Sequence, residues 1–231
     1  ILLVVIIVLA NAFILITGRT YMYKGLKETY LIGRSGPSIY DSLVFDSRKI
    51  EGSGEQDNWL REDSSKPLSV KQIQSLTEVE STSFLLVQHG KVVAEHYFDN
   101  HTKKTLSNSF SGSKSVVGLL IGIAVDKGMI KSLDEPISRY LDFIAAKDSN
   151  VTIRHLLGMT SDIDWSESGS NPLSDNAEAY YGSDLLSIMK KQPFKGGPNK
   201  VFDYASGNSQ LLGFILEKAT GQKVADFMSE N

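Results

Sequence analysis

The first 16 positions of the chain are apolar except for Asn11. A helix of that length rises about 24 Å and nearly crosses a hydrocarbon core of about 30 Å. No polar face recurs at helical spacing, as it would in a helix packed on a soluble core. We therefore expect residues 1–17 to form a membrane segment. A signal peptide cleaved near residues 10–12 is the alternative, but the apolar run continues further and favours an uncleaved transmembrane anchor.

A change of pattern near residue 83 separates a polar lead-in from a predicted domain. Residues 18–80 are polar and uneven, and the stretch 51–67 has the Gly, Ser and charge content of a linker. Two β-rich runs then flank His-Gly-Lys and predict a hairpin over residues 83–98, with Gly90 in its turn. We therefore expect a domain over residues 81–231.

Helical periodicity dominates the chain after the hairpin. From residue 111 to residue 127, apolar side chains recur three and four positions apart, and Gly128 stops the run. Leu119 and Ile123 extend this stripe nearly all round, so the helix is expected to be central and buried. Further helices are expected within 151–163, 183–191 and 208–221, with a long irregular loop at 162–181.

Composition and charge narrow the class of protein. With 41% hydrophobic and 22% charged residues, the chain has the composition of an ordinary globular protein. The net charge of −3 gives no basic footprint for nucleic acid. There is no cysteine, which excludes disulfides and thiolate metal sites, and the four histidines show no tight metal-ligand spacing. We therefore expect neither a metal nor an organic cofactor.

Candidate chemistry gathers where the long helix begins, in "FSGSK" at residues 110–114. A serine hydroxyl is a poor nucleophile until a nearby base takes its proton. Lysine can serve as that base only in its neutral form, which burial against apolar side chains favours. Ser111 and Lys114 are three positions apart and share one face at a helix start. Backbone N–H groups left unpaired there can stabilise a developing oxyanion.

The same spacing also has a simpler interpretation. Taken alone, it fits a helix cap beside a surface lysine better, and a second copy, Ser187 and Lys190, lies in an amphipathic stretch where the lysine should be solvated. Tyr204 precedes another helix, and a phenol near a lysine can relay protons between nucleophile and leaving group. Taken alone, Tyr204 fits a core tyrosine better.

Four stretches, taken in their order along residues 83–231, resemble the penicillin-recognising serine hydrolases. That superfamily includes class C β-lactamases, DD-peptidases, related esterases and 6-aminohexanoate-dimer hydrolases. "LLVQHGKVVAEHYF" is similar to the family's opening hairpin, and "FSGSKSVVGLLIGIAVDKGMIKSLDEPISRYL" to its nucleophile helix. "IRHLLGMTSDIDW" resembles its docking helix, and "GGPNKVFDYASGNSQLLGFILEKATGQ" its tyrosine-containing segment.

The resemblance implies a fold and a set of roles. The fold would be α+β with two layers, of the β-lactamase/transpeptidase type, here with the helical part and only the first hairpin of the antiparallel sheet. By position, Ser111 would be the acylated nucleophile, Lys114 its base or proton relay, and Tyr204 the second acid–base group. Ser206, a substrate-binding position, stands where β-lactamases and peptidases usually carry Asn. Asp162 replaces the usual glycine of Met-Thr-Ser-Gly.

The resemblance also implies a third motif, Lys-Thr-Gly or His-x-Gly, whose strand supplies the second oxyanion donor. Neither form occurs after Tyr204 in these 231 residues. We therefore expect a partial domain, truncated at its C-terminus, whose catalytic machinery is incomplete by itself.

Together these features predict a membrane-anchored serine hydrolase that forms an acyl-enzyme on an amide or ester, for example a cell-wall peptide. The resemblance implies a catalytic domain outside the cytoplasmic membrane. The basic residues Arg19, Lys24 and Lys27 favour a cytoplasmic flank instead, so the orientation stays open. A non-catalytic cell-wall or ligand sensor of the same fold is the alternative. An α/β-hydrolase is disfavoured because the chain has no Gly-x-Ser-x-Gly.

Overall fold

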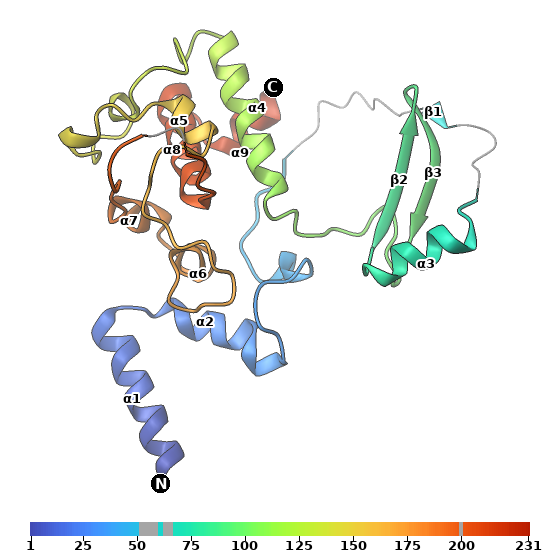
Figure 1. Cartoon of the computed structure of the whole chain (residues 1–231), viewed down its shortest axis with the longest axis horizontal. Helices are drawn as coiled ribbons and strands as arrows, with labels where there is room; N and C mark the ends of the chain where they lie inside the picture. The colour runs from blue at the N-terminus through green and yellow to red at the C-terminus, as the bar shows by residue number, and fades with distance from the viewer. Residues whose placement is uncertain (51–59, 62–66, 199–200) are drawn as a thin grey trace. The chain divides into compact units, whose positions relative to one another are not determined.

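The computed structural model describes residues 1–50, 60–61, 67–198 and 201–231 of the chain (Figure 1). These residues divide into two units. The helical unit comprises Ile1–Ile50 and Asn108–Asn231, and the hairpin unit lies within Glu51–Ser107. Most of the predicted linker at residues 51–67 falls outside the described residues.

The hairpin unit is built on two antiparallel strands, β2 (Ser83–Gln88) and β3 (Lys91–Tyr97). His89 and Gly90 join them with φ angles of 52° and 75°. A two-residue type I′ turn requires positive φ at both of its central residues. The predicted hairpin and the place of its turn are therefore confirmed.

Two further elements complete this unit. The short strand β1 (Leu60–Arg61) pairs in parallel with β3, so the strand order is β1-β3-β2. Helix α3 (Val70–Glu78) begins at a capping box in which the side chains of Ser69 and Gln72 each bond the other's backbone N–H.

In its described residues, the helical unit holds three long helices and several short ones. The long helices are α1 (Leu2–Thr17), α4 (Gly112–Asp126) and α8 (Ser206–Thr220). The short helices are α2 (Tyr21–Glu28), α5 (Ile153–Leu157), α6 (Asp175–Tyr181), α7 (Leu185–Lys190) and α9 (Val224–Glu230). Single 3-10 turns lie at Tyr30–Ile32, Asp41–Leu43, Ile137–Arg139 and Ala146–Asp148.

The core of the helical unit forms where α8 packs against α4 and α5. The apolar stripe of α8 is buried, and α4 buries Leu120, Ile121 and Ala124. The extent of α4 is close to the prediction, and Gly128 follows it with a φ of 71°. The expected burial all round α4 is wrong, because Leu119 is 70% exposed. The packed face is the one that α8 covers.

The predicted irregular loop at 162–181 is wrong in its last part, where α6 forms. Ser174 accepts a hydrogen bond from the backbone N–H of Ala177, and Asp175 and Glu178 lie in the first turn. A serine N-cap followed by acidic residues stabilises a helix start. The helix is short, and its buried side chains are Ala177 and Tyr181. Two inward residues are too few to give a clear periodic signal.

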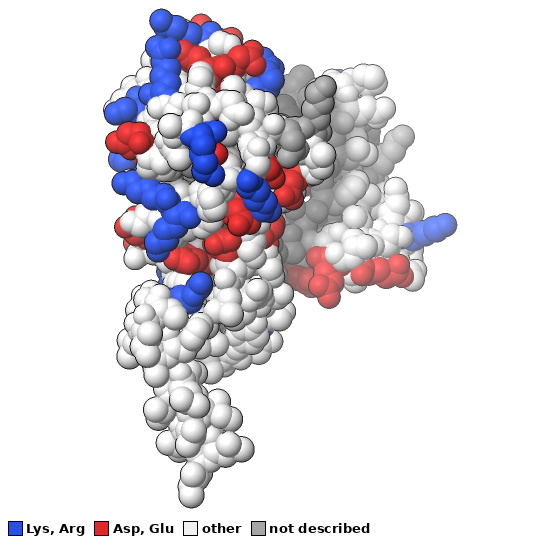
Figure 2. Space-filling view, turned by 60° about the vertical axis from the view of Figure 1, so that its left-hand side comes forward, with Lys and Arg blue, Asp and Glu red and all other residues white. Residues whose placement is uncertain are grey.

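The expected membrane segment at residues 1–17 forms α1, a helix of 16 residues. Figure 2 shows the surface of this protruding helix without charged side chains, whereas Lys, Arg, Asp and Glu are mixed over the rest of the unit's visible face. Among the described residues, no helix is both long and apolar enough to cross a membrane. The expected transmembrane helix is therefore not found.

Candidate active site

The candidate nucleophile, Ser111, lies directly before α4, after a residue with a positive φ angle. Phe110 has a φ of 44°, in the left-handed region that bulky side chains rarely adopt. The hydroxyl of Ser113 donates to the carbonyl of Phe110 at 2.7 Å. Ser111 occupies the N-cap position without a side-chain capping bond. Its hydroxyl is therefore not used to satisfy the helix start.

Two side chains, those of Lys114 and Tyr204, instead converge on the hydroxyl of Ser111. Lys114 Nζ donates to Ser111 Oγ at 3.0 Å, and the Tyr204 hydroxyl donates to the same oxygen at 2.8 Å. Lys114 Nζ also lies 4.9 Å from the centre of the Tyr204 ring. The structure thus brings together the serine, lysine and tyrosine that the sequence analysis selected, within hydrogen-bond distance of one oxygen.

Contacts with the Met-Thr-Ser segment hold the chain on both sides of Tyr204 in sequence. The amide of Asp203 donates to the carbonyl of Met159 at 2.8 Å, and Ala205 is buried. The hydroxyl of Ser161 donates to the side-chain oxygen of Asn208, both buried, which ties the start of α8 to the Met-Thr-Ser segment. Tyr204 itself stays 38% exposed. It therefore reaches Ser111 from a fixed backbone.

The fourth predicted residue, Ser206, is held by a carboxylate. Its hydroxyl donates to Glu167 Oε1 at 2.5 Å, and its backbone N–H donates to Glu167 Oε2 at 2.7 Å. Glu167 therefore satisfies one of the unpaired N–H groups at the start of α8. Because the Ser206 proton is used in this contact, its hydroxyl can offer only lone pairs to a bound molecule.

The structure explains how Asp162 is accommodated at the position where the resemblance expects glycine. Its φ is 63°, in the left-handed region that glycine adopts freely and aspartate tolerates. Its carboxylate accepts the backbone N–H of Gly196 at 2.8 Å. Its own carbonyl accepts the N–H of Lys195 at 2.9 Å. The aspartate thus keeps the glycine-like conformation and fixes the neighbouring loop.

A pocket of about 370 Å³ opens beside the nucleophile. That volume suits a small-molecule group. Ser111, Lys114 and Ser206 line it, and its apolar walls include Phe110, Val117, Trp165 and Tyr180. Trp165 packs over Gly207 of α8, and its indole N–H is buried with no partner among the described residues. Within those residues, no three His, Asp or Glu side chains gather as a metal site would require.

Sequence reasoning missed three residues of this site: Asn108, Glu167 and Tyr180. Asn108 donates to the Tyr180 hydroxyl at 2.9 Å, and Tyr180 stacks on Phe110 with 6.4 Å between ring centres. Burial and the nearby carboxylate of Asp41 raise the pKa of Tyr180 well above its usual value. These residues lie in irregular stretches or on the short α6, where no period singles them out. Their role depends on contacts between distant segments.

The fold and the cluster of Ser111, Lys114 and Tyr204 agree with one protein family. The helical unit and hairpin have the β-lactamase/transpeptidase-like fold, seen here as mostly helical with a two-strand hairpin. A model of the beta-lactamase family matches residues 70–231. The chain belongs to the beta-lactamase family.

Individual relatives are distant and longer than this chain. A 6-aminohexanoate-dimer hydrolase of Paenarthrobacter ureafaciens is 25% identical over 68% of this chain and 42% of its own length. A beta-lactamase of Escherichia coli is 31% identical over 52% of this chain and 30% of its own length. An uncharacterised protein of Alkalihalophilus pseudofirmus is 26% identical over 71% and 44%, respectively. The chain spans less than half the length of these curated relatives.

Solved structures support the fold. A candidate 6-aminohexanoate-dimer hydrolase from Bacillus anthracis aligns with a TM-score of 0.60 at 20% identity, over 71% of this chain and 46% of its own. A penicillin-binding protein from Bacillus halodurans aligns with a TM-score of 0.53 at 20% identity, over 68% and 52%.

Proposed function

We propose that the protein of which this chain is part is a serine hydrolase that cleaves an amide or ester through an acyl-enzyme. The observation that carries the proposal is the convergence of Lys114 Nζ and the Tyr204 hydroxyl on Ser111 Oγ, at 3.0 and 2.8 Å. Such contacts place a nucleophile within reach of the groups that can take and return its proton.

In the proposed reaction, Ser111, Lys114 and Tyr204 each have a separate role. Ser111 Oγ forms a bond to the carbonyl carbon, and its proton passes to Lys114 in its neutral form, directly or through Tyr204. The tetrahedral intermediate then expels the amine or alcohol, which leaves with a proton donated by Tyr204. Water hydrolyses the acyl–Ser111 ester by the reverse proton path and releases the acid. The backbone N–H of Ser111 is the proposed first oxyanion donor, because the N–H groups of Gly112, Ser113 and Lys114 donate to backbone carbonyls.

The substrate class is proposed from the named relatives and from Ser206. The relatives named as hydrolases act on different compounds, a 6-aminohexanoate dimer in one and a β-lactam in another. Ser206 and its bond to Glu167 differ from the asparagine that β-lactamases usually carry at that place. An amide oligomer or an ester is therefore favoured over a cell-wall peptide or a β-lactam.

Labelling tests the proposal in the full-length protein. A fluorophosphonate probe should react at Ser111, losing fluoride as the serine oxygen bonds to phosphorus, and peptide mass spectrometry should locate the adduct. Ser111→Ala should abolish the label, whereas Ser187→Ala should leave it. A label that survives Ser111→Ala would disprove the assignment. A native protein that takes up neither fluorophosphonate nor a fluorescent penicillin would support the alternative, a ligand sensor without catalysis.

We also propose that α1 attaches the protein to a membrane, with the catalytic part outside the cytoplasm. The support is the exposure of its apolar side chains, from 46% to 105% for residues 1–9. Deleting residues 1–17 should release the full-length protein from the membrane fraction, and protease added to intact cells should digest the anchored form. Retention after the deletion would refute the attachment.

A further inference from the structure

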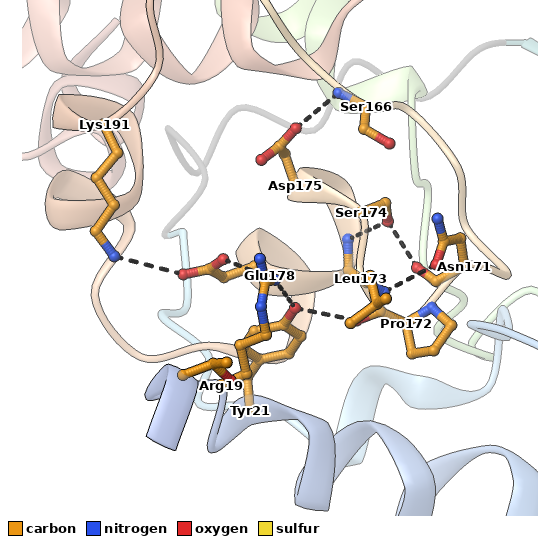
Figure 3. A network of polar contacts seen from close by, with 12 residues as sticks. Arg19, Tyr21, Ser166, Asn171, Pro172, Leu173, Ser174, Asp175, Glu178 and Lys191 are labelled. Atoms are coloured by element: carbon orange, nitrogen blue, oxygen red, sulfur yellow. Dashed lines mark hydrogen bonds and ion pairs between the residues drawn. The ribbon is translucent and has the colours of Figure 1, made fainter. Parts of the chain in front are cut away.

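The segment ahead of the family match, residues 19–45, is folded onto the loop that borders the candidate site. Arg19 pairs with Glu178 at 3.8 Å and donates to the Tyr21 hydroxyl at 2.9 Å (Figure 3). That hydroxyl in turn donates to the carbonyl of Pro172 at 3.0 Å. Lys191, directly after α7, contacts the other oxygen of Glu178 at 3.8 Å. One network therefore links this upstream segment to α6, α7 and the loop between residues 166 and 174.

Close backbone packing supports the same junction. Tyr21 is 8% exposed and packs with Ala177 and Tyr181. A Cβ added at Gly25 would come within 3.3 Å of the Tyr181 ring, and one at Gly36 within 3.3 Å of the Gly169 carbonyl. Both distances are tighter than ordinary contact, so the upstream segment is fitted to this loop by the absence of side chains at two positions.

A buried carboxylate connects the upstream segment to the pocket wall. Asp41 is 2% exposed, accepts the Ser38 N–H at 2.8 Å and pairs with Arg34 at 3.1 Å. The Tyr180 hydroxyl donates to Asp41 Oδ2 at 3.4 Å and accepts from the Asn108 amide at 2.9 Å.

The nucleophile side of the pocket is joined to the same segment. The N–H of Asn108 donates to the carbonyl of Ile39 at 2.8 Å, and Pro37 lines the pocket itself. Phe45 meets the Tyr180 ring edge-on at 4.8 Å between centres. Two residues that line the pocket, Asn108 and Tyr180, therefore contact the upstream segment directly.

The pocket is the candidate place for the acyl group of the substrate. Tyr204, the proposed proton donor to the leaving group, is not among the described residues that line it. In the proposed mechanism the leaving group lies beside that phenol, which leaves the pocket for the acyl group. Of the charged residues lining it, Lys114 contacts Ser111, and Glu167 has both oxygens engaged by Ser206. The remaining walls combine aromatic and aliphatic side chains with serine hydroxyls and side-chain amides, all uncharged, which suit an uncharged acyl chain.

We propose that residues 19–45 are a specificity element of the substrate site: through Asp41 they fix Tyr180 and Asn108 as a wall that selects substrates with an uncharged acyl group. This inference rests on the proposed serine hydrolase function. It assigns a site role to a segment outside the family match at residues 70–231.

The test compares p-nitrophenyl esters that share one leaving group, in the full-length protein. The acyl groups are acetyl, heptanoyl and 6-aminohexanoyl; the last two are nearly isosteric, and only the last carries a charge. The native enzyme should hydrolyse the heptanoyl ester with a kcat/KM at least about 10-fold above that of the aminohexanoyl ester, because both oxygens of the carboxylate lining the pocket already bind Ser206 and the ammonium would be poorly paired. A preference for the charged ester would overturn the assignment of an uncharged acyl group.

Variants then test the upstream segment. Asp41→Asn should lower the heptanoyl-to-acetyl ratio of kcat/KM by about 10-fold, while labelling at Ser111 persists. Asp46→Asn, an exposed aspartate five positions on, is the matched control and should keep the native ratio. Tyr180→Leu, which leaves Asp41 in place, should also lower the ratio and guards against misfolding of the first variant. If both variants keep the native ratio, the inference is wrong and the hydrolase function stands. If the native protein neither hydrolyses an ester nor takes the label, both fall.

Discussion

The chain carries Ser-x-x-Lys twice at the start of a helix, and the two copies lie in different surroundings. At α4, Ser111 receives hydrogen bonds from Lys114 and from Tyr204, which comes from 93 residues further along. At α7, Ser187 donates to the Asp184 carboxylate at 2.6 Å, and Lys190 lies 6.0 Å from the centre of the Phe143 ring. Equal local spacing therefore gives a candidate nucleophile in one place and a helix cap in the other.

The difference shows that the motif acquires its chemical meaning from tertiary contacts. Both serines lie at a helix start and both lysines lie on the following turn. Among the described residues, only the serine of the first copy receives a hydrogen bond from a phenol, that of Tyr204 just ahead of α8. The hydrogen bonds from Ser187 lower the pKa of Asp184, which makes that carboxylate a poor proton acceptor.

Replacing the lysine of each copy in turn should give the largest difference, measured as the rate of Ser111 labelling. Lys114→Met should slow acylation of Ser111 by a fluorophosphonate about 10³-fold, because the proton of Ser111 loses its acceptor. Lys190→Met should stay within about twofold of the native rate, because its ammonium is far from any candidate nucleophile. Labelling time courses on both variants measure the rates. Equal slowing in the two variants would contradict the distinction drawn between the copies.

A glycine in α8 tests the contact that delivers the phenol. A Cβ at Gly207 would lie 2.8 Å from Trp165 Cε3 and 3.1 Å from Cδ2, atoms of a rigid ring. Gly207→Ala should therefore cost about 1–3 kcal/mol of unfolding free energy and slow Ser111 labelling as the start of α8 shifts. Gly213→Ala in the same helix has no heavy atom within 4 Å. It should instead stabilise by about 0.5–1 kcal/mol, because alanine is the better helix former. Urea denaturation measures both; a harmless Gly207→Ala would show that the packing against Trp165 is adjustable.

The contrast between the two copies also marks what the sequence can predict. The hairpin around Gly90 and the extents of α4 and α8 follow from periodicity and from glycine at turns and helix ends, which act over a few residues. Selecting Ser111 over Ser187 needed four ordered stretches resembling one family. Local spacing alone could not distinguish the two serines.

Other features could not be predicted because they depend on contacts between distant segments. Glu167 lies in an irregular loop, and nothing near it in sequence indicates that it holds Ser206, 39 positions away. Asp41 lies in a stretch expected to be a polar lead-in, yet it is buried beside Tyr180. A charged residue in a polar stretch gives no signal of burial, because burial is decided by the partner that arrives from elsewhere.

A smaller difference between the two copies is expected in the stability lost when the residue at each helix N-cap is replaced. Asp184 accepts the N–H of Ser187 at 3.0 Å and caps α7, so Asp184→Ala should cost about 1 kcal/mol of stability. Ser111 makes no such capping bond, and Ser111→Ala should change the unfolding free energy by less than about 0.5 kcal/mol. Thermal unfolding of the two variants tests this. A large stability loss in Ser111→Ala would assign that serine a structural role instead.

The smallest predicted effect is the pH dependence of the α7 cap. The hydrogen bonds from Ser187 hold the pKa of Asp184 below its ordinary value of 3.8. The folded state then binds fewer protons than the unfolded state near that pH, so this contribution to stability is present above pH 3.8 and is lost as the pH falls through the folded-state pKa. Ser187→Ala should move the pKa of Asp184 back towards 3.8, as measured by carboxyl NMR titration. Ser111→Ala should leave that titration unchanged, since Ser111 lies in the other copy. If Ser187→Ala leaves the titration of Asp184 unchanged, the Ser187 hydroxyl does not lower the pKa of Asp184. The role given to Ser187 in the α7 cap would then be wrong.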